Sequence, residues 1–265
     1  MTTGTGFDLL APGAASALVL TACRTGGLVL VAPVFSGRVV PAPVRTAIVV
    51  LVAVLLQPAA RAAAAGTPLV TPATVVTETL IGLFIGLGAA VLIGAAESAG
   101  ELLSAQIGLS GAAVVDPLSL QQSTALGQFM HLFALSLLLA GNGHLVMLDA
   151  LAASVQKLPV GAPFNAPAGV FEALSLGTQL FALGFRFAAP VIAVVLIANV
   201  ALAVLSRAAP QLNILQLAFP VQILVGLSAL IVSIPVLAAW FLGWEATYDG
   251  VLTRVFSALT GAGGR

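Results

Sequence analysis

The sequence predicts an all-α, polytopic integral membrane protein built of hydrophobic helical hairpins. Hydrophobic residues fill 60% of the 265 positions, the mean hydropathy is +1.16, and charged residues make up only 7%. A soluble domain carries roughly 25% charged residues, so a soluble chain of this composition would need partners to bury nearly every apolar face. Several apolar runs reach the length of about 20 residues that a membrane-crossing helix needs. None of them alternates in the manner of a barrel strand.

No polar linker divides these apolar runs, so the sequence predicts one domain over residues 1–265, with a flexible glycine-rich tail at about 260–265. The first expected helix lies within 9–35. No basic residue precedes it, which fits an uncleaved membrane helix better than a signal peptide. The second, 44–60, follows a turn at 39–43, because proline and the residue before it resist helix.

The third expected helix, 75–96, has small residues on one face. They recur at every fourth position: Gly82, Gly86, Ala90 and Gly94. In membranes such stripes let helix backbones approach closely, so we expect them to pack against another helix. The alternative is that glycine and alanine are simply abundant in this chain.

Three further long apolar runs predict helices at 129–147, 171–206 and 215–244. Prolines and glycines make 154–168 a loop, and 207–213 reads as a polar turn. The run 171–206 is long enough for one extended or broken helix, and Arg186 and Pro190 mark the expected break. The aromatic residues that end the last run are typical of a membrane interface: Trp240, Trp244 and Tyr248.

The composition and motifs exclude several classes of function. The formal net charge is zero, so no basic patch points to nucleic acid. Cys23 is the single cysteine, which rules out an internal disulfide and a cysteine-based metal site. His131 and His144 are too far apart for one helical face. We therefore expect no enzyme activity, no cofactor and no metal.

Charges within apolar segments are costly and are functional candidates by default. They are Arg24, Glu78, Arg186, Glu97 and Glu101. The last two are four residues apart on one helix face, where carboxylates repel. They could serve a proton or ion relay, contact arginines of neighbouring subunits, or end a helix in water, and the sequence slightly favours the water-exposed end.

Residues 106–122 hold a concentration of helix breakers. Glycine costs a helix interior about 1 kcal/mol and proline about 3 kcal/mol, and Gly108, Gly111 and Pro117 fall close together. Irregular backbone at membrane depth is tolerated only where protein buries it or it lines a wet cavity. The sequence thus predicts a non-helical loop in a lumen or an interface.

Several short motifs follow one another along the chain: Ala99–Gly100–Glu101, Gln106–Ile107–Gly108–Leu109–Ser110, Asp116–Pro117, Asn142–Gly143–His144, Arg207–Ala208–Ala209–Pro210–Gln211–Leu212–Asn213–Ile214 and Phe219–Pro220. In this order they resemble the FliR/SctT family of type III export-gate proteins. Each motif alone is weak, but their order and spacing cover most of the chain.

The resemblance implies a structural subunit that assembles with FliP-like and FliQ-like subunits, with an FlhB-like subunit in association. It implies a place in the flagellar basal body in the bacterial inner membrane, and unfolded exported proteins in transit through the channel. The alternatives are a subunit of a virulence injectisome, or a small secondary transporter or ion channel using Glu97, Glu101 and Arg186.

The resemblance also assigns residues to roles. The plug that closes the channel would be Gly108, Leu109, Ser110, Gly111, Ala112, Ala113, Val114, Val115, Asp116 and Pro117. Polar contacts between subunits would come from Glu97, Glu101, Gln106, Arg207, Gln211 and Asn213.

Overall fold

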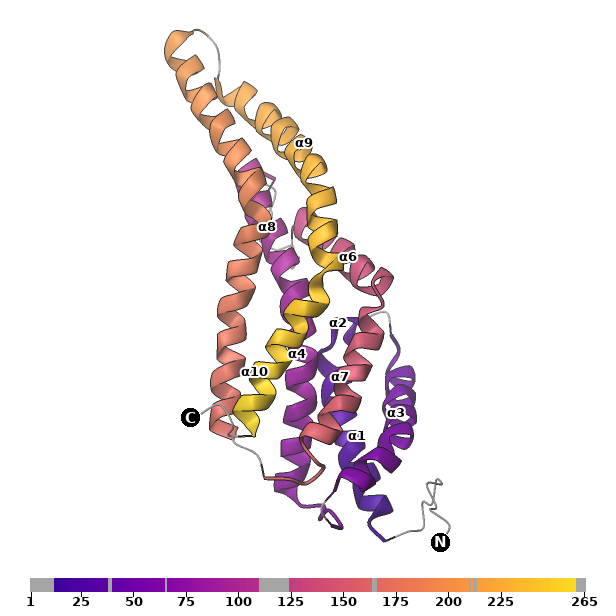
Figure 1. Ribbon diagram of the computed structural model, residues 1–265. Helices are drawn as coiled ribbons and strands as arrows, with labels where there is room; N and C mark the ends of the chain where they lie inside the picture. The colour runs from indigo at the N-terminus through magenta and orange to yellow at the C-terminus, as the bar shows by residue number, and fades with distance from the viewer. Residues whose placement is uncertain are drawn as a thin grey trace. The chain divides into compact units, whose positions relative to one another are not determined.

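A computed structural model describes residues 12–37, 40–64, 66–109, 124–163, 166–209, 211 and 214–260, which form helices joined by turns (Figure 1). No strand occurs in these ranges. The helices are α1 (Ala14–Val31), α2 (Pro33–Ser36), α3 (Ala42–Ala63), α4 (Pro72–Ile107), α6 (Ala125–Ala140), α7 (Gly143–Lys157), α8 (Ala166–Ala208), α9 (Ile214–Leu242) and α10 (Trp244–Leu259).

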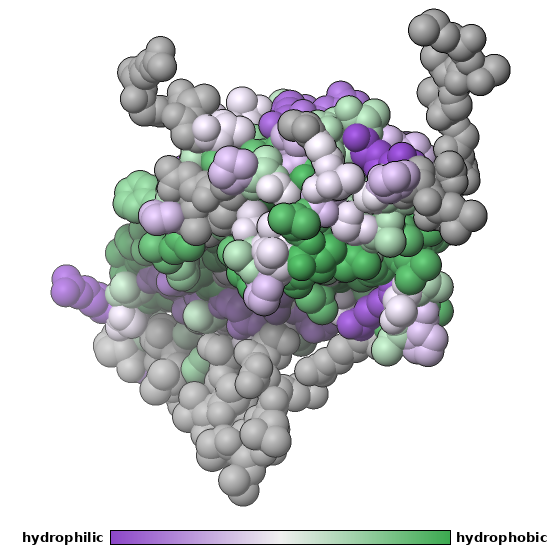
Figure 2. Space-filling view, turned by 90° about the horizontal axis from the view of Figure 1, so that it is seen from below, coloured by the Kyte–Doolittle hydropathy of each residue, from purple (hydrophilic) through white to green (hydrophobic). Residues whose placement is uncertain are grey.

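Five of the described helices are long and apolar enough to cross a membrane: α1, α3, α4, α8 and α9. The pair α6 and α7 is bent by 67° at a short break and counts as a sixth span if taken together. Hydrophobic residues gather in one region of the face shown in Figure 2, with hydrophilic residues beside them. The prediction of an all-α polytopic membrane protein is confirmed.

The chain forms two compact units, which are described separately below. The first comprises Met1–Val91, Leu139–Gly177 and Glu245–Arg265, and the second comprises Leu92–Leu138 and Thr178–Trp244. Whether the chain acts as the single domain predicted from the sequence stays a prediction.

In the first unit, glycines bring α1 and α4 into backbone contact. A Cβ on Gly82 of α4 would collide with the Arg24 carbonyl and lie 2.9 Å from the Leu28 nitrogen. A Cβ on Gly27 of α1 would meet the Thr79 carbonyl of α4. Close helix contact through small residues increases van der Waals packing where lipid offers no hydrophobic driving force.

Several helix boundaries differ from those expected. The third expected helix, 75–96, is longer in the structure, where α4 runs to Ile107. The break expected at Arg186 and Pro190 is wrong, since α8 continues through both. A proline inside a helix removes one N–H···O bond, here the bond to the Arg186 carbonyl, and the apolar turns on either side keep theirs. The run 129–147 is instead divided before Gly143, where Asn142 has φ 56°. Helix α10 was not expected at all.

Candidate functional site

Of the predicted plug, Gly108 and Leu109 are described and belong to the second unit, whereas Ser110–Pro117 lie outside the described residues. Gly108 follows the last turn of α4 with φ +84°, a left-handed conformation that glycine adopts without strain. The Leu109 N–H donates to the Ser104 carbonyl at 2.9 Å, which closes the helix end. A Cβ on Gly108 would lie 3.3 Å from the Phe219 ring of α9.

Glu101 contacts Thr124, where the described chain resumes before α6. Its Oε1 accepts a hydrogen bond from the Thr124 N–H at 2.7 Å, and Thr124 Oγ1 accepts one from the Gly127 N–H at 3.1 Å. These bonds satisfy N–H groups at the start of α6 that have no partner within the helix. The carboxylate also lies at the positive end of the helix dipole. A carboxylate on α4 therefore caps α6.

Glycines make this contact between α4 and α6 close. A Cβ on Gly127 would collide with the Glu101 carboxylate, and a Cβ on Gly100 would lie 2.7 Å from the Gly127 Cα. A larger residue at either position would push the two helices apart and withdraw the carboxylate from the Thr124 N–H.

Glu97, one turn before Glu101, has a different partner on α6. Its Oε2 lies 3.0 Å from His131 Nδ1, and the two side chains are 37% and 32% exposed. The two carboxylates that share a face of α4 thus bind separate groups on α6. Partial exposure to solvent reduces what such a pair adds to stability.

The other residues assigned to subunit contacts do not join this cluster in the described structure. Gln106, Arg207 and Gln211 are exposed, and Asn213 lies outside the described residues. Among the stripe residues, Gly82 and Gly86 are buried and Ala90 is half-buried. A Cβ on Gly94 would lie 3.1 Å from Leu180 Cδ1 of α8.

The sequence identified Arg24 and Glu78 as costly charges but did not pair them. In the first unit, Arg24 Nε on α1 lies 2.6 Å from Glu78 Oε2 on α4, and both side chains are buried. A buried charge needs such a partner, because an isolated ion would lose its hydration without compensation. The sequence showed that two separate apolar runs carry opposite charges, an arginine and a glutamate. Sequence spacing alone does not reveal that the two helices bring them into contact.

Further hydrogen bonds complete this buried network. Arg24 Nη1 donates to Ser154 Oγ at 3.1 Å and Nη2 donates to the Leu158 carbonyl at 2.9 Å. Glu78 Oε1 accepts from the Gly161 N–H at 2.9 Å, and Gly161 has φ +81°. The network thus ties α1, α4, α7 and the turn after α7 together.

Tyr248 on α10 provides a second buried polar contact in the first unit. Its hydroxyl donates to the Ile85 carbonyl at 3.0 Å. Burial raises the pKa of this hydroxyl, and the neighbouring Asp249 charge adds to the effect.

Over the described ranges, no group of three or more histidine, cysteine or acidic side chains could hold a metal ion.

Comparisons with known proteins agree with the arrangement of apolar helices. Residues 15–244 match the family described as "Bacterial export proteins, family 1". The flagellar biosynthetic protein FliR of Escherichia coli (strain K12) is 34% identical over 220 residues, which cover 81% of this chain and 83% of that protein. FliR of Caulobacter vibrioides is 30% identical over 238 residues, covering 88% of this chain and 93% of that protein.

Proposed function

The chain belongs to the bacterial export proteins of family 1, and from this membership we propose that it is a structural subunit of the type III export gate. In this role it assembles with FliP-like and FliQ-like subunits, and with an FlhB-like subunit, in the inner membrane at the flagellar basal body. Unfolded flagellar proteins pass through the channel that these subunits form. The match over residues 15–244 is the observation that carries the proposal.

The exposed apolar surface of the helices supports an assembled state. In α3, α8 and α9, only 17% of the most apolar 18-residue window is buried within the chain. Large side chains such as Phe181 and Val232 are 75% and 77% exposed. Lipid or other subunits must cover such a surface, because exposure of so large an apolar area to water is unfavourable.

The plug remains part of the proposal. The Gly108 end of α4 and the Glu101 cap on Thr124 support fixed attachment points on either side of it. Small apolar residues such as Ala112 and Val114 can close around a passing chain without sequence-specific contacts.

Deleting residues 109–115 should leave assembly intact and make the membrane permeable to small ions. Ion flux across vesicles carrying the assembled gate measures this. A deletion variant that assembles and stays tight would show that the plug lies elsewhere.

The contacts of Glu97 and Glu101 favour the gate over the transporter alternative, which used these residues and Arg186. Glu97 and Glu101 contact His131 and Thr124, which gives each carboxylate a structural partner. Solute uptake by the purified chain alone in liposomes would support the transporter alternative.

A role in the flagellar system is preferred to a role in an injectisome because the relatives described above are flagellar biosynthetic proteins.

Purification of the chain from its own membranes tests the proposed assembly. A tagged chain should co-purify with FliP-like and FliQ-like subunits in fixed ratios after mild detergent extraction. A tagged membrane protein of similar hydropathy, expressed at the same level, is the control. Recovery of the chain as a monomer in the same detergent in which those subunits stay associated would contradict the proposal.

A further inference from the structure

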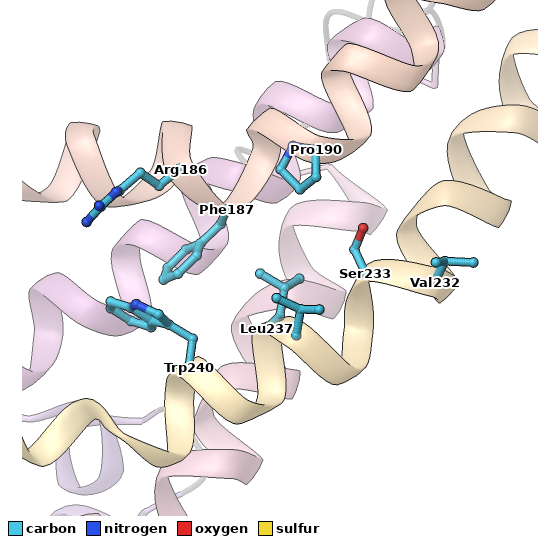
Figure 3. Close-up of a pocket in the computed structure, with 8 residues that line it drawn as sticks. Arg186, Phe187, Pro190, Val232, Ser233, Leu237 and Trp240 are labelled. Carbon is cyan, nitrogen blue, oxygen red and sulfur yellow. The ribbon is translucent and has the colours of Figure 1, made fainter.

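A groove between α8 and α9 of the second unit has an arginine at one end and apolar side chains along the rest. Its volume is about 440 Å³, and it is lined by Arg186, Phe187, Pro190, Val232, Ser233, Val236, Leu237 and Trp240 (Figure 3). Arg186 and Trp240 lie at the same end, and Pro190 and Val232 lie toward the other (Figure 3). The groove is therefore amphipathic along its length.

Aromatic contacts and a hydrogen bond between α8 and α9 hold the two sides of the groove together. The Phe187 ring meets Trp240 edge-on, with centroids 4.7 Å apart, and lies 5.3 Å from the Phe241 ring. Farther along the hairpin, Gln222 Nε2 donates to Asn199 Oδ1 at 2.6 Å and joins α9 to α8. The Ser233 hydroxyl donates to the Ala229 carbonyl within its own helix, so it offers an occupant no free donor.

Arg186 is the charged group that needs a counter-ion. Its side chain is exposed, and no hydrogen bond or ion pair joins it to any part of the chain that the structure describes. An arginine in an apolar helix is costly unless an anion or water reaches it. An anionic occupant would supply a counter-ion at this end of the groove.

The helices α8 and α9 are long enough for this charged end to reach a membrane interface. At 1.5 Å per residue, the stretches from Arg186 to the end of α8 and from the start of α9 to Trp240 extend roughly 33 Å and 39 Å. Both slightly exceed the hydrocarbon thickness of about 30 Å. If the turn between the helices lies at one interface, Arg186 and Trp240 reach the opposite one, where tryptophan is enriched.

We propose that this groove binds one anionic phospholipid, with its phosphate on Arg186 and an acyl chain along Pro190, Val232 and Val236. The volume falls in the range of about 300–1,000 Å³ typical of small-molecule sites. Apolar side chains line the groove beyond its charged end: Pro190, Val232, Val236 and Leu237.

Contact between lipid and Trp240 tests this proposal. The purified full chain is reconstituted into phosphatidylcholine vesicles with equal fractions of brominated phosphatidylglycerol or brominated phosphatidylcholine, and tryptophan quenching is measured. Trp240 is half-buried and Trp244 is buried, so Trp240 should dominate the response. One cation contributes about 1 kcal/mol of attraction, which predicts a preference of roughly fivefold for the anionic lipid.

Arg186→Gln should bring the preference close to one. The matched control is Arg254→Gln, which removes the same charge from a residue outside the groove and should keep the preference. Val236→Phe, which fills the apolar end while keeping Arg186, should also lower it. Because Arg186 and Val236 are both exposed, neither variant removes a core contact.

A wild-type preference near one, or an unchanged preference in Arg186→Gln, would overturn the proposal. Loss of partner subunits from Arg186→Gln with unchanged quenching would assign Arg186 to a carboxylate on a partner's helix, and would overturn it equally. A negative result would leave the proposed export role untouched, because co-purification measures that role separately.

Discussion

At the scale of single residues, the buried ion pair between Arg24 and Glu78 stabilises the packing of α1 on α4. Arg24 and Glu78 are buried, and each also has a backbone partner, the Leu158 carbonyl and the Gly161 N–H. Removing one member of a buried pair leaves the other charge without compensation. Replacing both members by apolar residues removes both charges together.

Arg24→Met should therefore destabilise the chain by about 3–5 kcal/mol. The double variant Arg24→Met with Glu78→Leu should lose less, because it leaves no unpaired charge, although the Leu158 carbonyl and the Gly161 N–H lose their partners. Thermal unfolding in detergent, run as a double-mutant cycle, measures both. Arg254→Met is the control for loss of an exposed arginine. Equal losses in the single and double variants would show that the ion pair does not determine stability here.

At the same scale, Glu101 should control the start of α6. Glu101→Ala removes the acceptor of the Thr124 N–H, and loss of a cap costs about 0.5–2 kcal/mol. Hydrogen exchange should become faster at residues 124–128. Glu101→Gln keeps a carbonyl oxygen and should retain most of the protection. Unchanged exchange in Glu101→Ala would mean that the cap is dispensable.

At the scale of helices, the packing of α1 on α4 depends on where glycines meet a neighbouring backbone. A Cβ on Gly82 would collide with the Arg24 carbonyl, whereas a Cβ on Gly26 of α1 meets no atom within 4 Å. Gly82→Ala should destabilise the isolated chain by about 1–3 kcal/mol through overpacking. Gly26→Ala should be neutral or stabilising by up to about 1 kcal/mol. Comparable melting temperatures for the two variants would contradict this packing.

Apolar run length and proline position predicted where most helices lie, and the helix end at Gly108 followed from its glycine. Two features of the elements did not follow from pattern. Pro190 does not interrupt α8, because a long apolar helix can lose one backbone bond without ending. The helix break at Asn142 depends on the left-handed backbone conformation of this residue, which few sequence features predict.

The candidate site was predicted only in part. Glu97 and Glu101 stood out from the sequence because charges are rare in this chain. Their partners, His131 and the Thr124 N–H, lie 34 and 23 residues away along the chain. The spacing of residues within one helix cannot predict contacts between residues so far apart in the sequence. Such contacts depend on how α4 and α6 pack against each other.

On the scale of the whole molecule, the chain exposes apolar helices that need lipid or other subunits. Membership of the bacterial export proteins, family 1, supports partners from the export gate. The groove that contains Arg186 adds a candidate contact with lipid to that surface. The chain is therefore best understood as one part of an assembly.

Secretion is the measurement that tests the proposed export role most directly. Flagellar proteins in the culture medium are quantified in cells lacking the gene, in cells complemented with this chain, and in the parent strain. The export role predicts that the deletion abolishes secretion while intracellular levels of the same proteins persist, and that the chain restores it. Normal secretion without the gene would contradict the assignment of this chain to the export gate.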